Sequence, residues 1–277
     1  MSDRRLADAD VAAFERDGYV FKRGLFDAGE VALMQRAIAE DAAIRENLVA
    51  LLDAAGGSTE LALWNHPGDD VFGAVARSER VVSAMQRLLG GEIYHYHSKL
   101  TMKAPKTGGA WNWHQDYGYW YQNGCLFPDL ASAMIAIDPS TRENGCLQVV
   151  KGSHRLGRIE HLRVGGQTSA DPERMDPILA RLELLHCEMA PGDALFFHCN
   201  TLHASSPNTS DKPRNVLICC YNAASNDPYK EHHHPRYTKL TPLADDQVIR
   251  ARIGRSDRDT AFYDPADDQT VTAGKKT

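Results

Sequence analysis

The sequence predicts one domain with a β sandwich or barrel as its core and helices covering one face of it. Three observations predict this fold class. Amphipathic helical patterns dominate roughly the first 90 residues. Beyond residue 92, short apolar runs alternate with turn sequences such as Glu143-Asn-Gly145, Pro191-Gly-Asp193 and Ser206-Pro-Asn208. Apolar residues make up 43% and charged residues 25% of the 277-residue chain, which is typical of a globular protein.

Start and stop signals define the N-terminal elements. Four elements are expected: a helix over residues 8–16 that Gly18 ends, a strand over 19–22, a helix opened by the capping box Asp27-Ala-Gly-Glu30, and a helix that follows Ser78 and ends at Gly90. We therefore expect residues 1–91 to form a mostly helical cover.

Six β-rich runs predict the core. They span residues 92–102, 131–137, 146–150, 182–189, 194–198 and 216–221. We expect residues 92–225 to form the β core that carries the functional site, and residues 226–277 to form a C-terminal extension of the same domain with a loose tail. The polar excursion over residues 157–181 predicts a loop with a short helix. It is a candidate lid with Gly165-Gly166 as its hinge, or a plain surface insertion.

Charge and cysteine usage narrow the class of protein. The net charge is −6, which argues against general binding to nucleic acids or anionic membranes. No apolar run reaches the length of a membrane span, and the start MSDRRLADAD has no apolar signal region. Six cysteines without a CxxC pair predict reduced thiols. We expect a cytoplasmic protein with a small-molecule partner, and the sequence leaves its oligomeric state open.

One short motif combines metal-binding chemistry with an unusual density of aromatic rings. In an extended segment, the side chains of His114 and Asp116 project to the same side, where one imidazole and one carboxylate can bind a single ion. Six large rings lie within the eleven residues 111–121. A walled pocket needs such rings, whereas a surface turn does not.

His203 is the candidate third ligand. It lies 203 − 116 = 87 residues beyond Asp116, soon after an apolar strand, and a β-sandwich closes such a distance by pairing strands that are not adjacent in sequence. Two histidines and one carboxylate on one face of an ion are typical of non-haem Fe(II) oxygenases. Three positions stay open, two for a 2-oxoacid and one for O2. Arg214, eleven residues later, would bind the far carboxylate of that co-substrate.

The other histidines are less informative. His95 and His97 are expected to share one face of a strand, which is weakly indicative of a pocket. The run His232-His233-His234 is interpreted as a solvated polar cluster rather than a metal site.

Motifs from residue 6 to residue 225 resemble the phytanoyl-CoA dioxygenase family of Fe(II)/2-oxoglutarate oxygenases, which includes ectoine hydroxylase. The resembling segments are Val11–Val20, Arg23–Phe26, Trp113–Asp116, Glu143–Leu147, Gly152–His154, Pro191–Asp193 and His203 with Arg214. The resemblance implies a double-stranded β-helix, the jelly roll of cupins. It implies iron ligands His114, Asp116 and His203, and a 2-oxoglutarate contact by Arg214. By similarity, Trp111, Trp120 and Ser205 would line the pocket for 2-oxoglutarate or substrate.

The implied activity is hydroxylation of an unactivated C–H of a small molecule, with release of CO2 and succinate. Asp116 favours hydroxylation over halogenation, since related halogenases carry a small residue there. Polar residues after the motif differ from ectoine hydroxylase, so we expect another substrate, such as an aminoalkylphosphonate or an amino-acid-like zwitterion. Candidate substrate contacts are Tyr117, Tyr119, Lys99, Lys103, Asn112 and Asn222.

Three alternative functions remain at this point. One is a CoA-thioester or lipid hydroxylase of the same family. The second is a zinc hydrolase, since two histidines and a carboxylate also suit Zn²⁺. The third is a binding protein that keeps the pocket without catalysis.

Overall fold

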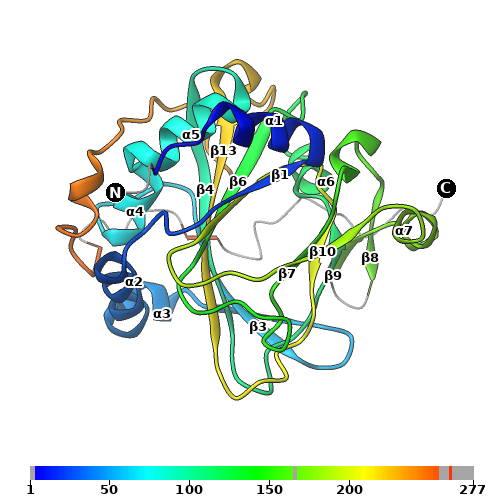
Figure 1. Cartoon of the computed structure of the whole chain (residues 1–277), viewed down its shortest axis with the longest axis horizontal. Helices are drawn as coiled ribbons and strands as arrows, with labels where there is room; N and C mark the ends of the chain where they lie inside the picture. Colours follow the sequence, from blue (N-terminus) through cyan, green and yellow to red (C-terminus); the bar gives the residue numbers. More distant parts are fainter. Residues whose placement is uncertain (1–3, 165–166, 256–261, 264–277) are drawn as a thin grey trace.

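Two antiparallel sheets face each other in the computed structural model, which describes residues 4–164, 167–255 and 262–263 (Figure 1). The larger sheet has the strand order β1-β11-β6-β13-β4-β3-β2, and the smaller has the order β10-β7-β12-β5. The strands are β1 (Tyr19–Lys22), β2 (Val49–Leu52), β3 (Ser58–Trp64), β4 (Ile93–Lys103), β5 (Trp111–His114), β6 (Leu130–Ala136), β7 (Leu147–Val150), β8 (His161–Val164), β9 (Gln167–Ala170), β10 (Leu184–Cys187), β11 (Ala194–His198), β12 (His203–Ser205) and β13 (Arg214–Ala223).

Helices cover the outer face of the larger sheet (Figure 1). The helices are α1 (Asp8–Asp17), α2 (Ala28–Glu40), α3 (Ala42–Glu46), α4 (Val71–Arg77), α5 (Glu79–Leu89), α6 (Asp116–Trp120) and α7 (Pro172–Leu179). Side chains along β13 point alternately to the two faces of the larger sheet, and this alternation divides the core into an outer and an inner layer. Leu217 and Cys219 pack outward against helical residues, whereas Val216 and Ile218 pack inward against the smaller sheet. The jelly-roll fold predicted from the sequence is confirmed.

Most of the helices and strands predicted from the sequence are present, and most of the residues expected to begin or end the helices do so. The reciprocal bonds of the capping box join Asp27 and Glu30 at 2.9 and 3.0 Å. Gly18 and Gly90 end α1 and α5 in the left-handed conformation, with φ of 83° and 76°, which only glycine adopts freely. Ser78 differs from the expectation, because its hydroxyl donates to the Val75 carbonyl and not to the helix that follows.

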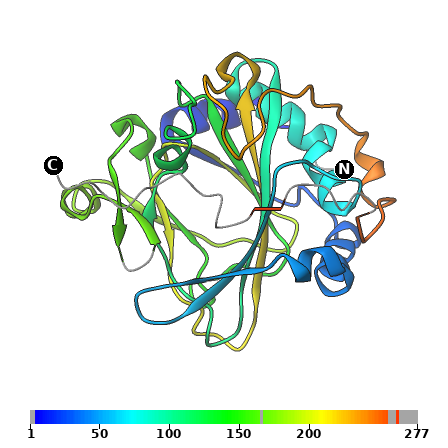
Figure 2. The ribbon, with the colours of Figure 1, turned by 180° about the vertical axis from the view of Figure 1, so that it is seen from behind.

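Two segments differ from their predicted form. Residues 1–91 are not only a helical cover, because β2 and β3 form a hairpin that extends the larger sheet (Figure 2). The excursion over 157–181 contains the hairpin β8–β9 as well as α7. Its expected hinge, Gly165-Gly166, and the expected loose tail after residue 264 lie outside the described residues. In the C-terminal extension, Leu243 and Arg252 form bridges with Ser78 and Asp70 on the helical side.

A bulge in β4 decides which side chains enter the space between the sheets. Cys220 on β13 pairs with His97 and the next residue, Tyr221, pairs with His95, so Tyr96 is one extra residue in β4. His95 therefore lies on the outer side with Tyr221, while His97 lies on the inner side with Cys220. The expectation that both histidines share one face is wrong. From His97 onward, every second residue of β4 points inward, including Lys99 and Lys103.

The part of the chain that the structure describes has no helix long and apolar enough to cross a lipid bilayer.

Candidate functional site

His114, Asp116 and His203 meet between the two sheets. Their ligand atoms all lie within 4.8 Å of one another, and His203 Nε2 is 3.8 Å from Asp116 Oδ1. The two imidazole centroids are 4.1 Å apart. All three residues are buried, with 3–4% of their surface exposed. Residues far apart in the sequence therefore form one compact donor set.

Strand pairing brings the two histidines together. His203 on β12 pairs directly with His114 on β5, in the smaller sheet. Asp116 differs from the expectation, because it is not part of an extended segment but is the first residue of the short helix α6. The carboxylate thus reaches the histidines at the turn from strand to helix, and Gln115 between them stays extended, with φ −110° and ψ 137°.

Backbone carbonyls fix the orientation of both imidazoles. Nδ1 of His114 is 2.7 Å from the carbonyl of Asn112, and Nδ1 of His203 is 2.9 Å from the carbonyl of Thr201. A carbonyl only accepts, so each Nδ1 carries the hydrogen and each Nε2 keeps its lone pair for a metal. Burial, followed by the nearby His203, lowers the pKa of His114 well below its ordinary value. Burial also lowers the pKa of His203. Neutral imidazoles are the form that binds metals.

Ser132 on β6 holds the third ligand, because its hydroxyl donates to Asp116 Oδ2 at 3.1 Å. Replacing Ser132 by alanine is expected to weaken metal binding by about 10- to 100-fold, as for other groups that orient metal ligands. Equilibrium titration of the purified protein with Mn²⁺ and Fe²⁺ measures the affinity. Ser140→Ala is a matched control, since Ser140 is also buried and its hydroxyl has no partner among the described residues. Equal affinities of the two variants would contradict the role of Ser132.

Two residues that the sequence interpretation missed support the motif. The side chain of Gln115 donates to the carbonyls of Gly157 and Asn200 and accepts from the amide of Ile159. Its own backbone amide donates to Nε2 of His161 at 2.9 Å. In the sequence, Gln115 could be noticed only because it lies between His114 and Asp116. His161 lies 46 residues beyond Gln115, and no pattern in the sequence connects the two residues.

A second polar centre is formed by two cations and a serine. Lys103 and Arg214 are direct partners across β4 and β13. Nζ of Lys103 donates to Ser205 Oγ at 2.8 Å, and Nε of Arg214 is buried without a partner in the described part of the chain. Burial, and then Arg214, lower the pKa of Lys103 to about 6, while burial lowers the pKa of Arg214 to about 10. A buried guanidinium beside a buried lysine that an anion would keep protonated favours an anion between them.

Ser205 connects this cationic centre to the metal ligands. It lies two residues after His203 on β12, so both side chains share one face. A register shift in β5 pairs Trp111 with Ser205 and His114 with His203. The Trp111 ring consequently lies 6.1 Å from the His114 ring. The predicted residues Arg214, Ser205 and Trp111 therefore gather at one end of the site, and Lys103 joins them there rather than a separate substrate region.

Lys99, Tyr119 and Trp120 lie around the metal ligands. Nζ of Lys99 is 3.9 Å from Asp116 Oδ1. The Tyr119 ring meets the His114 ring edge-on at 5.8 Å. Trp120 contacts the rings of Tyr96 and His97, whereas Trp111 contacts the ring of His114.

Three candidate substrate contacts are occupied by structural bonds. The hydroxyl of Tyr117 donates to the carbonyls of Cys125 and Leu126. The Asn112 side chain donates to Val164, and the buried Asn222 side chain bonds Tyr94 and Asn226. Each of these polar groups has a partner inside the fold, and their contact with a substrate stays a prediction.

The histidine run also differs from its interpretation. His232 and His233 are half-buried, but His234 is 8% exposed and stacks on His97 with ring centroids 4.7 Å apart. Among the described residues, only the group of His114, Asp116 and His203 has a metal-binding arrangement.

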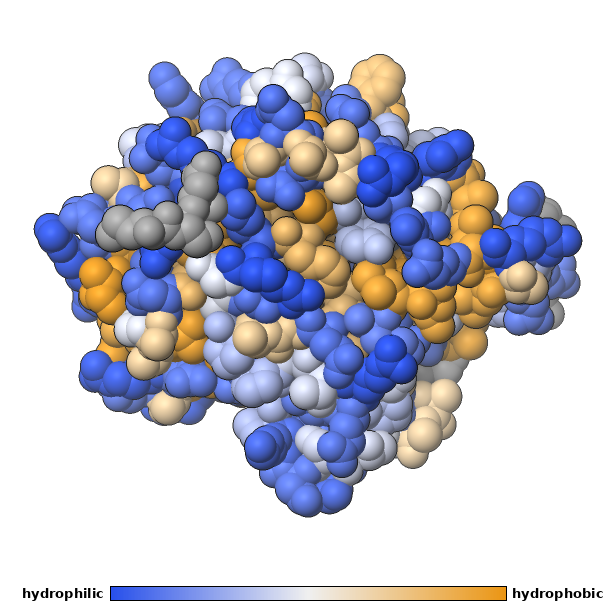
Figure 3. All heavy atoms as spheres, viewed as in Figure 1, coloured by the Kyte–Doolittle hydropathy of each residue, from blue (hydrophilic) through white to orange (hydrophobic). Residues whose placement is uncertain are grey.

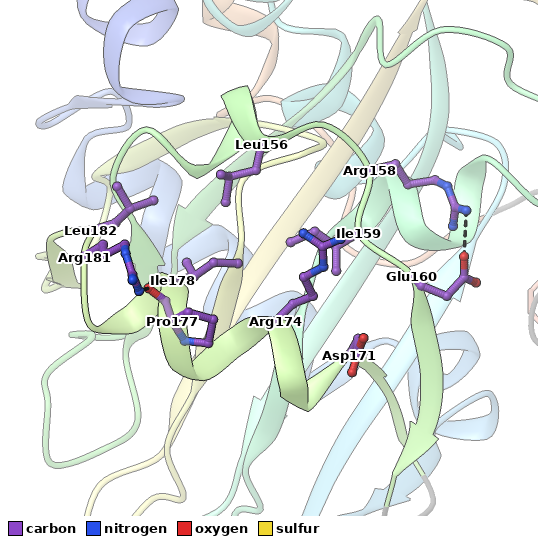
Figure 4. A pocket seen from close by; sticks show the side chains of 10 residues that line it. All are labelled: Leu156, Arg158, Ile159, Glu160, Asp171, Arg174, Pro177, Ile178, Arg181 and Leu182. Carbon is purple, nitrogen blue, oxygen red and sulfur yellow. Dashed lines mark hydrogen bonds and ion pairs between the residues drawn. The ribbon is translucent and has the colours of Figure 1, made fainter.

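A surface pocket of about 510 Å³ lies outside the metal group, between α7 and residues 156–160 (Figure 4). Its lining combines apolar residues such as Leu156 and Ile178 with three arginines, Arg158, Arg174 and Arg181. Figure 3 shows exposed apolar residues on the side of the molecule that carries α7. None of the three metal-binding residues lines this pocket.

Two neutral imidazoles and one carboxylate suit Fe²⁺ and Zn²⁺ alike. The adjacent cationic centre distinguishes these possibilities, because a hydrolase needs no buried anion site next to its metal, whereas a 2-oxoacid carries a second carboxylate that fits one.

Comparison with known proteins agrees with this geometry. The profile of the family described as phytanoyl-CoA dioxygenase (PhyH) matches residues 14–216. L-proline trans-4-hydroxylase of Streptomyces griseoviridis is 33% identical over 241 residues, which cover 80% of this chain and 88% of that enzyme. Ectoine dioxygenase of Sphingopyxis alaskensis is 29% identical over 247 residues, which cover 81% and 78% of the two chains.

Solved structures show the same fold. EctD from S. alaskensis with 2-oxoglutarate and 5-hydroxyectoine superposes with a TM-score of 0.73 at 24% identity, covering 88% of this chain and 89% of that chain. The carbocyclase SnoK from nogalamycin biosynthesis, described as non-heme and alpha-ketoglutarate dependent, gives a TM-score of 0.66 at 23% identity, covering 84% and 97%.

Proposed function

The chain belongs to the phytanoyl-CoA dioxygenase family of Fe(II)/2-oxoglutarate-dependent dioxygenases, and on this premise we propose that it hydroxylates a small amino-acid-like zwitterion. The single observation that carries the proposal is the buried group of His114, Asp116 and His203 beside a buried pair of cations. Bound iron, with 2-oxoglutarate and O2, supplies the oxidation that converts a C–H into a C–OH while CO2 and succinate are released.

In this proposal His114, Asp116 and His203 hold the iron. The backbone bonds to both Nδ1 atoms keep the Nε2 lone pairs available, and the Ser132 hydroxyl fixes the carboxylate. Burial excludes water from the reacting atoms. The protein thus contributes a pre-arranged donor set on rigid strands.

Arg214, Lys103 and Ser205 hold the distal carboxylate of 2-oxoglutarate. The unpartnered Nε of Arg214 and the adjacent ammonium of Lys103 supply two positive donors at one place. Trp111 lines the passage between this end and the metal ligands. Lys103 is therefore assigned to the co-substrate and not to the substrate.

Lys99 and Tyr119 face the substrate. When Asp116 binds iron, its negative charge is largely neutralised, so its ion pair with the ammonium of Lys99 is weaker. The ammonium then favours a carboxylate on the substrate. The named activities of the relatives, on L-proline and ectoine, support a small amino-acid-like substrate over an acyl-CoA or lipid.

Succinate formation tests the proposal. The protein, loaded anaerobically with Fe²⁺ and then supplied with 2-oxoglutarate and O2, is expected to form succinate slowly without a substrate and faster with L-proline, ectoine or a related zwitterion. Zinc-loaded protein is the control and should form none. Absence of succinate in every arm would refute the oxygenase, and stimulation by acyl-CoA alone would refute the substrate class.

A further inference from the structure

A second pair of buried histidines lies against Trp120 of α6, the helix that begins with Asp116. His97 projects inward from β4, and His234 comes from the C-terminal extension, beyond the residues matched by the family profile. Their rings are stacked, with centroids 4.7 Å apart and planes at 24°. The two residues are only 2% and 8% exposed.

His97 has no hydrogen-bond partner in the described part of the chain, although both of its ring nitrogens are fully buried. Burial, followed by the charge of Lys99, lowers the pKa of His97 well below its ordinary value, so the ring is neutral. A neutral imidazole has one N–H donor and one acceptor nitrogen. Leaving both unsatisfied inside a protein is unfavourable, and such groups are rare in native structures. The position therefore calls for a polar ligand.

Asn65 fixes the hydrogen of His234. The side-chain nitrogen of Asn65 donates to the backbone carbonyl of His233 at 2.6 Å, so the amide oxygen is the atom that lies 3.1 Å from His234 Nδ1. Since an amide oxygen only accepts, Nδ1 of His234 carries the hydrogen. Burial lowers the pKa of His234 well below its ordinary value, so the ring is neutral and Nε2 is a bare acceptor.

The surroundings of the pair favour a cationic donor. The rings of Tyr96 and Trp120 contact His97, and Tyr96 also contacts His234 at 4.7 Å. Aromatic faces attract cations and not anions. Lys99 lies two residues from His97 on the same face of β4 and reaches toward Asp116. Acceptor nitrogens and aromatic rings, which favour a cation, thus lie along the same face of β4 as the ammonium of Lys99.

We propose that His97 and His234 bind the protonated amine of the substrate while Lys99 binds its carboxylate. The assignment rests on the proposed function and deepens it, because it explains which part of the site recognises the N–H group of a zwitterion. It also gives the C-terminal extension a role, since this segment delivers His234 to the site.

Matched ligands and isosteric variants test the assignment. Protein loaded anaerobically with Fe²⁺ and 2-oxoglutarate is titrated with L-proline, with ectoine and with cyclopentanecarboxylate, which has the ring and carboxylate of proline but no N–H. The change in the visible absorption of the iron–2-oxoglutarate complex reports binding without turnover. The wild type is expected to bind one of the zwitterions about 10- to 100-fold more tightly than cyclopentanecarboxylate, the effect of one hydrogen bond to a charged group.

Replacing His234 by asparagine or by glutamine tests the roles of its two ring nitrogens separately. H234N keeps a polar group at the Nδ1 position and loses the Nε2 acceptor, whereas H234Q reaches the Nε2 position. H234N and H97F are expected to lose the preference for the zwitterion, and H234Q to retain most of it. His186→Gln, a half-buried histidine on β10, is the control and should behave as wild type.

The outcomes separate this inference from the proposed function. Slow succinate formation by the wild type without substrate tests the oxygenase itself, and His186→Gln should leave that rate unchanged because His186 lies outside the proposed site. If succinate forms normally but H234N and H97F keep the wild-type preference, the assignment of the histidine pair is wrong. It is also wrong if the wild type binds neither zwitterion, or binds cyclopentanecarboxylate equally well. Absence of succinate in the wild type would instead refute the oxygenase itself.

Discussion

Replacing His114 by alanine is expected to abolish iron retention and to reduce succinate formation by about a thousandfold or more. The reason is geometric, because the proposed site offers three protein ligands to the ion and all three are buried. No other described group of side chains is arranged to replace the missing ligand. The same result is expected for Asp116→Ala and His203→Ala. Metal content after gel filtration and succinate yield are the two measurements.

A second variant, His114→Asn, shows whether the loss of iron has a cause other than a loss of folding. His114→Asn retains a donor near the Nδ1 position, and so retains the bond to the Asn112 carbonyl, but lacks the Nε2 ligand. It should unfold at nearly the wild-type temperature and still lose iron. A folded His114→Asn protein with full iron content and activity would show that the metal lies elsewhere.

Replacing Arg214 or Lys103 by methionine is expected to raise the 2-oxoglutarate concentration needed for half-maximal rate by about 100-fold. Methionine keeps most of the unbranched apolar stem but removes one nitrogen donor from the pair proposed to face the distal carboxylate. Truncating one member of a buried charge pair costs about 2–5 kcal/mol, which brackets this factor. Calorimetric binding of 2-oxoglutarate to Mn²⁺-loaded protein measures the same loss without turnover.

The lowered pKa of Lys103 also predicts how 2-oxoglutarate binding depends on pH. In the ligand-free protein its pKa is lowered to about 6, by burial first and by Arg214 second. A bound carboxylate favours the ammonium and raises that pKa, so the complex holds more protons than the free protein above pH 6. Binding therefore takes up a proton, and 2-oxoglutarate affinity is expected to fall as pH rises above about 6. In Lys103→Met this dependence should disappear.

Lys106→Met is the matched control for both measurements, because Lys106 lies three residues along the chain but is exposed and pairs only with exposed groups. Its 2-oxoglutarate affinity and pH dependence should equal those of the wild type. Wild-type behaviour of Arg214→Met would mean that the co-substrate carboxylate binds at another place.

Local patterns in the sequence determined the fold class and the metal chemistry. Strand and helix ends follow from short-range rules, so the capping box at Asp27 and the terminating Gly18 and Gly90 were placed correctly. The motif residues His114, Asp116 and His203 also come together in three dimensions. His114 and His203 do so by direct strand pairing, whereas Asp116 joins them at the start of a helix and not by the alternation of a strand.

Tertiary structure alone decided which polar side chains meet in the interior. One extra residue at Tyr96 switches the face of the sheet to which alternate side chains of β4 point, so that His97 and the two lysines point inward and His95 points outward. Long-range bonds occupy Tyr117 and Asn222, and the C-terminal extension adds His234 from far along the chain. Periodicity carries no information about a bulge or about partners distant in sequence, because both depend on how separate strands pair. The sequence by itself therefore determined an iron and 2-oxoglutarate chemistry, whereas strand register decided which residues stand ready to recognise the substrate.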